Sequence, residues 1–379
     1  MIYLDHAATS PVQPEVLNQM LPWLQPDHVG NPSSIHTQGI QARRAIEEAR
    51  RQVARMINAD PQEVYFTSGG TESNNSWIRN LDRHIILTTK VEHHSIIEPI
   101  ENGVVSAAYI RPVYVGVDSF GAIDLGDLKT KLDCFKGVTG AVSVMWVNNE
   151  LGTINPIKEI GSICRSYNVP LHVDAIQAAG HIPIDVKDCY IDMLSLSGHK
   201  FGAPTGVGAL YVRRDITKKP MLYGGGQEHG VRGGTENIPG IIGIGAAAKL
   251  VNDNIDTWRF EWRMLRRAFI EDLTKYMGDD PFIINGGNNV SHNIISLTIP
   301  GVHGESLMIL LDAEGVCVSA GAACSSGSPN PSHVLLGVGI SEELAESTIR
   351  VSMGIGTTAE EMNIAAKTIA DSVRRLKAM

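Results

Sequence analysis

Short apolar runs alternate with longer amphipathic segments over the first two thirds of the chain. Residues 15–24 and 35–57 place apolar side chains at helical spacing, and the second segment gathers its charges on one face. The apolar runs are short enough to be strands and cover 64–67, 84–88, 107–115, 141–147, 171–173, 191–195 and 207–212. Strands that alternate with helices predict an α/β fold, with a mostly parallel sheet and helices on both faces.

The pattern changes after a long helical stretch, for which we expect a bend, at residues 238–276. Beyond it, strand-like runs cover 294–299, 316–319 and 349–352. Two further helical segments cover 306–311 and 359–377. This mixture predicts a smaller α+β domain. We place the boundary between the two predicted domains inside the long helical stretch, near Asp256.

Composition narrows the class of protein. Hydrophobic residues make up 43% of the 379 positions, and the net charge is −9 without a block of Lys and Arg, so we expect no direct nucleic-acid binding. No apolar stretch reaches the length of a membrane span, and the amino terminus lacks the pattern of a signal peptide. The five cysteines form no C-x-x-C pair, so neither a disulfide framework nor a metal site is expected, and the cytoplasm is the predicted location.

Lys200 is the most informative candidate for chemistry. It follows the small polar residues Ser195, Ser197 and His199 at the end of an apolar run, and a turn rich in Gly and Pro comes after it. A lysine in this position can form a Schiff base with pyridoxal 5'-phosphate, while the small polar neighbours bond the phosphate. The alternative for any lysine is a solvated surface charge, but these neighbours favour a buried, reactive amine.

Two further segments fit a cofactor site. Asp174 ends a predicted strand, where its carboxylate can pair with a protonated pyridine nitrogen; the alternative is a helix N-cap. Gly70 and Thr71 stand in a glycine turn that follows a strand and opens a helix, where free N–H groups bind anions. For that turn, a tight connection without a ligand is the alternative.

Three more polar side chains extend the candidate site. His93 follows a predicted strand, and its ring can stack on a cofactor and move protons; the alternative is a core or surface histidine without a role in chemistry. A metal role is disfavoured, because adjacent histidines in an extended segment point to opposite sides. Asn149 lies in a turn, where it either bonds cofactor or substrate or only shapes the turn. Thr235 lies in a glycine-rich loop that is either a flexible connector or the source of a phosphate contact across a dimer interface.

Cys324 stands in a run of small residues, 319–331, which predicts an exposed and mobile loop. A thiol in such a loop suits nucleophilic chemistry, because it can attack the sulfur of a substrate cysteine and become a persulfide. Cys317 lies in an apolar strand and is predicted to be structural. Arg350, on a predicted strand, either clamps a substrate carboxylate through two hydrogen bonds or forms a surface salt bridge.

Taken in order, these motifs resemble the cysteine desulfurases of the NifS/IscS-like group, in the class V aminotransferase family. The resemblance covers nearly the whole chain, and the ordered set is far more specific than any single motif. It rests on residues 3–9, 30–36, 67–74, 92–93, 147–152, 172–177, 195–200, 224–235 and 321–335.

The resemblance implies the aminotransferase-like fold of pyridoxal-phosphate enzymes, fold type I, with a seven-stranded sheet. It also implies that the first residues return to the small domain. The predicted large domain therefore spans residues 12–256, and the small domain spans 1–11 and 257–379, including the Cys324 loop. A homodimer with active sites at the subunit interface is implied as well.

For the active site, the resemblance implies a division of roles. Lys200 holds pyridoxal phosphate and moves the Cα proton, His93 stacks on the ring and assists acid–base steps, and Asp174 pairs with the ring nitrogen. Arg350 and Asn149 orient the substrate carboxylate. Gln177 and Asn149 lie near the phenolic oxygen of the cofactor. The phosphate is bound by Gly70, Thr71, Ser197 and His199, and a further contact comes from Thr235, which the partner subunit supplies.

Cys324 is implied as the acceptor of sulfur from L-cysteine, which leaves L-alanine and a persulfide for transfer to an acceptor protein. Two alternatives stay open: another enzyme of the same fold, such as an aminotransferase or a selenocysteine lyase, and a non-catalytic sulfur-relay scaffold. The final acceptor also stays open, because iron–sulfur cluster assembly, tRNA thiolation, other sulfur-bearing cofactors and DNA phosphorothioation all use such enzymes.

Overall fold

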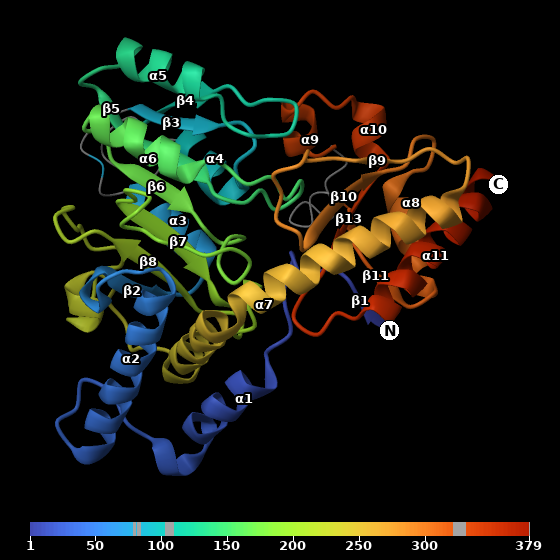
Figure 1. Ribbon diagram of the computed structural model, residues 1–379. Coiled ribbons are helices and arrows are strands. Elements are labelled where there is room, and N and C mark those ends of the chain that lie inside the picture. The colour runs from blue at the N-terminus through green and yellow to red at the C-terminus, as the bar shows by residue number, and fades with distance from the viewer. Residues whose placement is uncertain (79–80, 82–84, 103–109, 321–330, 379) are drawn as a thin grey trace.

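The computed structural model describes residues 1–378 apart from 79–80, 82–84, 103–109 and 321–330 (Figure 1). Cys324 therefore lies outside the described residues. No helix in the described part of the chain is both long and apolar enough to cross a membrane.

A seven-stranded sheet forms the centre of the larger part of the molecule. Its strands, in spatial order, are β2 (Val64–Thr67), β8 (Gly208–Val212), β7 (Met193–Ser197), β6 (Leu171–Asp174), β5 (Thr139–Met145), β3 (Ile85–Thr89) and β4 (Arg111–Val115). Strand β8 runs antiparallel to both of its neighbours, and the other described pairs are parallel. The predicted α/β fold with a mostly parallel sheet is confirmed.

Helices cover both faces of this sheet, as the alternating pattern predicts (Figure 1). One face packs against α2 (Thr37–Met56), α5 (Leu125–Cys134), α6 (Ile157–Ser166) and the first part of α7 (Ile238–Met277). The other face packs against α3 (Gly70–Ile78) and α4 (His94–Glu101). Side chains that are neighbours along a strand enter different cores, because successive residues of a strand point to opposite faces.

A second, smaller sheet lies near both termini (Figure 1). It is antiparallel and consists of β12 (Ser319–Ala320), β13 (Thr348–Ser352), β10 (Ile294–Thr298) and β9 (Ile283–Ile284), while β1 (Ile2–Tyr3) pairs with β11 (Val316–Cys317). This part has its own core, built with α8 (Gly304–Ala313), α11 (Ala359–Lys377) and the second part of α7. The domain boundary near Asp256 stays a prediction.

Shorter elements complete the described chain. They are α1 (Pro14–Met20), α9 (His333–Gly337), α10 (Glu342–Glu346) and the 3-10 turns Leu21–Leu24, Pro26–His28, Pro61–Glu63, Gly198–Lys200 and Gln227–Gly230. The sequence predicts one helix over 15–24, but the structure has α1 followed by a 3-10 turn that contains Pro22. Proline has no N–H to donate within a helix, so the regular helix ends before it.

The long helical stretch is one helix, α7, of 40 residues, and the bend expected in it stays a prediction. One other prediction differs from the structure. The run 316–319, predicted as one strand, is divided: β11 pairs with β1, and β12 pairs with β13. A period-two pattern identifies an extended segment but not which partner each half finds.

Candidate active site

The carboxyl ends of several strands converge on one cavity of about 330 Å³. Such edges are where ligands bind in open α/β sheets. Of the site residues predicted from the sequence, the cavity is lined by Gly70, Thr71, His93, Asn149, Asp174, Gln177, Ser197, His199, Lys200 and Arg350. The turns after β2, β3, β5, β6 and β7 thus bring together residues that lie far apart in the sequence.

Lys200 is placed by the 3-10 turn Gly198–Lys200, which follows β7 directly. The residue is half-buried, and its Nζ donates hydrogen bonds to the carbonyl oxygens of Ala7 and Ala8, at 2.7 and 2.8 Å. This lysine is therefore not a solvated surface charge. The two carbonyl groups come from the extreme amino terminus, a contact that the sequence analysis did not anticipate.

Asp174 is buried at the end of β6. Its Oδ1 accepts a hydrogen bond from the backbone N–H of Ile176, and its Oδ2 accepts one from the side-chain amide of Asn74, at 3.0 and 2.7 Å. Burial raises the pKa of Asp174, and the two hydrogen bonds and the Lys200 charge oppose this rise. The residue does bond its own following turn, as the N-cap alternative requires, yet it also lines the cavity.

His93 is the N-cap of α4, and its Nδ1 accepts the backbone N–H of Ser95 at 3.0 Å. Nδ1 is thus an acceptor, which assigns the proton of the neutral ring to Nε2. Burial, followed by the positive charge of Lys200, lowers the pKa of His93 to about 4. The imidazole is consequently neutral at pH 7. His93 keeps the expected extended backbone as the residue that caps α4, whereas His94 is already the first residue of the helix.

Arg350 lies on β13, from the smaller sheet, with only 2% of its surface exposed. Nη1 donates to the carbonyl oxygen of Asn149 at 2.8 Å, and Nη2 donates to Asp5 at 2.9 Å. The guanidinium is thus neither a surface salt bridge nor a free side chain. It joins the amino-terminal segment to the turn that follows β5.

Two buried carboxyl groups beside the cavity were missed by sequence reasoning. Glu92 accepts hydrogen bonds from the hydroxyl of Thr89 and the backbone N–H of Met145, and burial raises its pKa to about 8. Glu150 accepts a hydrogen bond from Ser332, and burial raises its pKa to about 7. Both stand inside motifs quoted above, but adjacent sequence carries no signal of complete burial.

The structure does not bring every predicted site residue to this cavity. Thr235 borders a separate cavity of about 240 Å³, together with Ser68 and Arg232. Cys324 lies outside the described residues. The placement of both with respect to Lys200 therefore stays a prediction.

Two amide oxygens in the main cavity wall bear on its occupant. Oδ1 of Asn149 and Oε1 of Gln177 are buried without a hydrogen-bond partner among the described residues. Buried polar atoms are normally paired, so these two atoms fit a cavity whose occupant is polar. The cavity volume also falls in the range that suits a small-molecule ligand.

Comparison with known proteins shows the family to which the chain belongs. The cysteine desulfurase IscS of Dictyoglomus turgidum is 42% identical over 99% of this chain and 95% of its own length. A solved NifS-like protein superposes with a TM-score of 0.89 at 32% identity, covering 99% of this chain and 100% of its own. A structure described as SspA in complex with cysteine has a TM-score of 0.78 at 33% identity, and the match covers 93% of this chain and 99% of that one. Because residues 2–364 also match the family pattern, the chain belongs to the aminotransferase class-V family.

Proposed function

We propose that the chain is a pyridoxal-phosphate-dependent cysteine desulfurase. The observation that carries the proposal is the convergence of Lys200, Asp174, His93 and Arg350 on one cavity, in a chain whose relatives include named cysteine desulfurases. In the overall reaction, the Cβ–sulfur bond of L-cysteine breaks and a sulfur–sulfur bond to the Cys324 thiol forms. The products are L-alanine and a persulfide on Cys324.

The cavity residues fit pyridoxal phosphate. Lys200 supplies the amine, Asp174 the carboxylate for the ring nitrogen, and Gly70, Thr71, Ser197 and His199 the phosphate contacts. The buried oxygens of Asn149 and Gln177 have no hydrogen-bond partner among the described residues, so both can accept a hydrogen bond from a ligand at the same wall of the cavity. Pyridoxal phosphate, when bound, supplies an electron sink that stabilises negative charge at the substrate Cα.

The protein's own groups then have separate tasks. The Lys200 amine moves the proton at the substrate Cα. Neutral His93 carries its ring proton on Nε2, because Nδ1 accepts the backbone N–H of Ser95, and this proton is the one that His93 can donate in acid–base steps. Arg350 binds the substrate carboxylate; its Nε is buried and has no hydrogen-bond partner among the described residues, so the guanidinium retains donor capacity.

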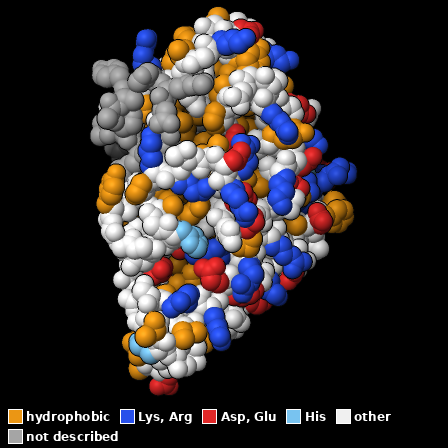
Figure 2. Space-filling model, turned by 90° about the vertical axis from the view of Figure 1, so that its left-hand side faces the viewer, with side chains coloured by type: hydrophobic (Ala, Val, Ile, Leu, Met, Phe, Trp, Pro, Cys, Tyr) orange, Lys and Arg blue, Asp and Glu red, His pale blue; other side chains and the backbone are white. Residues whose placement is uncertain are grey.

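We propose a cytoplasmic homodimer that hands sulfur to an acceptor protein. Several large apolar side chains are strongly exposed in the isolated chain: Leu24, Val29, Ile35 and Tyr223 are 62%, 75%, 91% and 88% exposed. A second copy would cover them and could bring Thr235 to the phosphate site of its partner. Basic and acidic side chains are interspersed on the face in Figure 2, which favours a protein over a nucleic acid as immediate acceptor.

Two substitutions test the proposed function. Lys200→Ala should remove the absorbance of the bound cofactor and lower alanine formation from cysteine at least about 10³-fold. Cys324→Ser should keep the cofactor absorbance but form no protein persulfide. Lys158→Ala and Cys134→Ser are matched controls, because both side chains are exposed. Persulfide transfer by Cys324→Ser at the parent rate would refute the role of this thiol, and keto-acid formation would favour an aminotransferase.

A further inference from the structure

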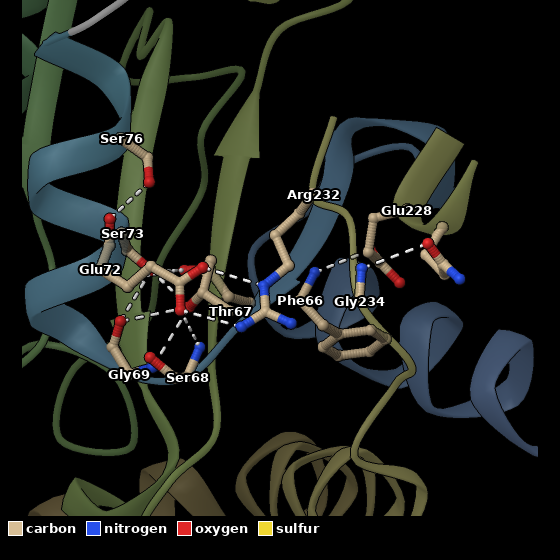
Figure 3. Close-up of polar contacts among 12 residues, drawn as sticks. Phe66, Thr67, Ser68, Gly69, Glu72, Ser73, Ser76, Glu228, Arg232 and Gly234 are labelled. Carbon is tan, nitrogen blue, oxygen red and sulfur yellow. Dashed lines mark hydrogen bonds and ion pairs between the residues drawn. The ribbon is translucent and has the colours of Figure 1, made fainter. Parts of the chain in front are cut away.

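The loop at residues 224–235 is tied to helices α2 and α3 by two ion pairs that the proposed mechanism does not use. Figure 3 shows the pair between Arg232 and Glu72. The turn at residues 68–71 opens α3 and carries the Gly70 and Thr71 N–H groups proposed for the phosphate. A loop that is otherwise rich in glycine is therefore fixed against the proposed phosphate site.

The ion pair nearest to this site joins Arg232 to Glu72. Arg232 Nε and Nη2 donate to the two carboxylate oxygens of Glu72 at 3.0 and 3.3 Å. The same carboxylate accepts the backbone N–H of Ser68 at 2.7 Å. Burial alone would raise the pKa of Glu72, but the bonds from Arg232 and Ser68 outweigh burial and hold the pKa below its ordinary value.

The second ion pair anchors the start of the loop. Arg50 donates two hydrogen bonds to Glu228, at 2.7 and 2.8 Å, and Glu228 also accepts the backbone N–H of Phe66 at 2.8 Å. Glu228 and His229 both have positive φ angles, 44° and 56°, which is unfavourable for residues with a side chain. The buried, two-pronged ion pair stabilises this backbone and thereby places Arg232.

The position of Glu72 creates an electrostatic problem for phosphate binding. Its carboxylate lies in the first turn of α3, where a phosphate dianion is expected at Gly70 and Thr71. Two negative charges this close repel each other, more strongly at a partly buried site than in water. Arg232 cancels the charge of Glu72 and holds the carboxylate on the Ser68 N–H.

We propose that Arg232 is a positioning residue for the cofactor phosphate and acts through Glu72. The inference rests on the proposed function, because it requires a pyridoxal-phosphate site at Gly70 and Thr71. It assigns to the Arg232–Glu72 pair the control of how tightly the phosphate end of the cofactor binds.

The test compares pyridoxal phosphate with pyridoxal, which lacks the phosphate, in absorbance titrations of the full-length apoprotein. Arg232→Gln should raise the Kd for pyridoxal phosphate at least about tenfold and leave the Kd for pyridoxal unchanged. Arg51→Gln is the matched control, because Arg51 forms an exposed ion pair with Glu48. An equal loss of affinity for pyridoxal phosphate and pyridoxal would overturn the inference, because a general structural defect weakens the binding of both ligands alike.

A second variant separates action through Glu72 from direct contact with phosphate. The side-chain amide introduced by Glu72→Gln still accepts the Ser68 N–H but carries no charge. Adding this substitution to Arg232→Gln should therefore restore most of the affinity, and a double variant that binds as weakly as Arg232→Gln would overturn the mechanism. Should Arg232→Gln fail to fold, Arg232→Lys keeps the charge, and its Kd should stay close to that of the parent; a tenfold loss there would contradict charge cancellation.

The outcomes also separate this inference from the proposed function. A parent protein that binds no pyridoxal phosphate would refute the function itself. The role of Arg232 alone would be refuted if the parent binds pyridoxal phosphate and releases alanine from cysteine while Arg232→Gln has the parental Kd for pyridoxal phosphate.

Discussion

Burial decides the ionisation of the side chains around the cavity. It lowers the pKa of His93 and of His199 to about 4, with the charge of Lys200 as the next cause for both. It raises the pKa of Glu92 to about 8 and that of Glu150 to about 7. The proposed site thus combines neutral imidazoles with carboxyl groups that hold protons near neutral pH.

Glu92 carries a prediction for the dependence of stability on pH. The folded protein keeps a proton on Glu92 up to about pH 8, whereas the unfolded chain releases it near the ordinary pKa of 4.5. The stabilisation from this proton is complete below pH 4.5 and is lost as the pH rises to about 8. The free energy of unfolding of the apoprotein should therefore decline over this range, by at most about 1.4 kcal/mol per pH unit from one proton.

Urea unfolding at several pH values measures this slope. In Glu92→Gln the group cannot titrate, so the decline between pH 4.5 and about 8 should be shallower than in the parent. Glu305→Gln, at an exposed position on α8, should keep the parental slope. An identical slope in Glu92→Gln and the parent would show that Glu92 ionises normally in the folded state.

Helix α7 is the element that connects the two cores. Its first part contributes Ile241, Ile244 and Val251 to the core of the large sheet, and its second part contributes Trp262 and Phe269 to the core of the smaller sheet. The forty-residue helix is thus a shared support for β7, which leads into the Lys200 turn, and for β13, which carries Arg350 (Figure 1).

Close packing of α7 on α2 depends on Gly245. A Cβ at this position would lie 2.5 Å from the Cα and Cβ of Ala49, which is too close for any side chain. Gly245→Val should therefore lower the free energy of unfolding by about 1–3 kcal/mol through overpacking. Lys249→Val, at an exposed position one turn along, controls for the helix propensity of valine. A urea midpoint unchanged in Gly245→Val would mean that the helices can separate without cost.

For the molecule as a whole, the proposed dimer predicts a particle of twice 41.0 kDa in sedimentation equilibrium. Tyr223→Glu places a charge on an apolar side chain that is 88% exposed in the single chain, and it should shift the protein toward the monomer. Lys249→Glu is the control for an added negative charge, because Lys249 is an exposed side chain that is already charged. A parent that sediments at 41.0 kDa would refute the dimer.

Features encoded by neighbouring residues could be predicted before the fold was known. The helix predicted at 359–377 has those bounds in the structure, with a capping box between Thr358 and Glu361 at its start. Lys200 was identified from the residues around it, and the structure places it directly after β7. Periodicity, caps and turn residues act over a few positions, so they can be interpreted from the amino-acid order alone.

Contacts between segments that are far apart in the chain became known only from the packed structure. The bonds from Lys200 to Ala7 and Ala8 and from Arg350 to Asp5 are of this kind. So is the raised pKa of Glu92, because desolvation depends on everything that surrounds a side chain. Local sequence specifies which elements form, but the environment of a functional group exists only after those elements have packed together.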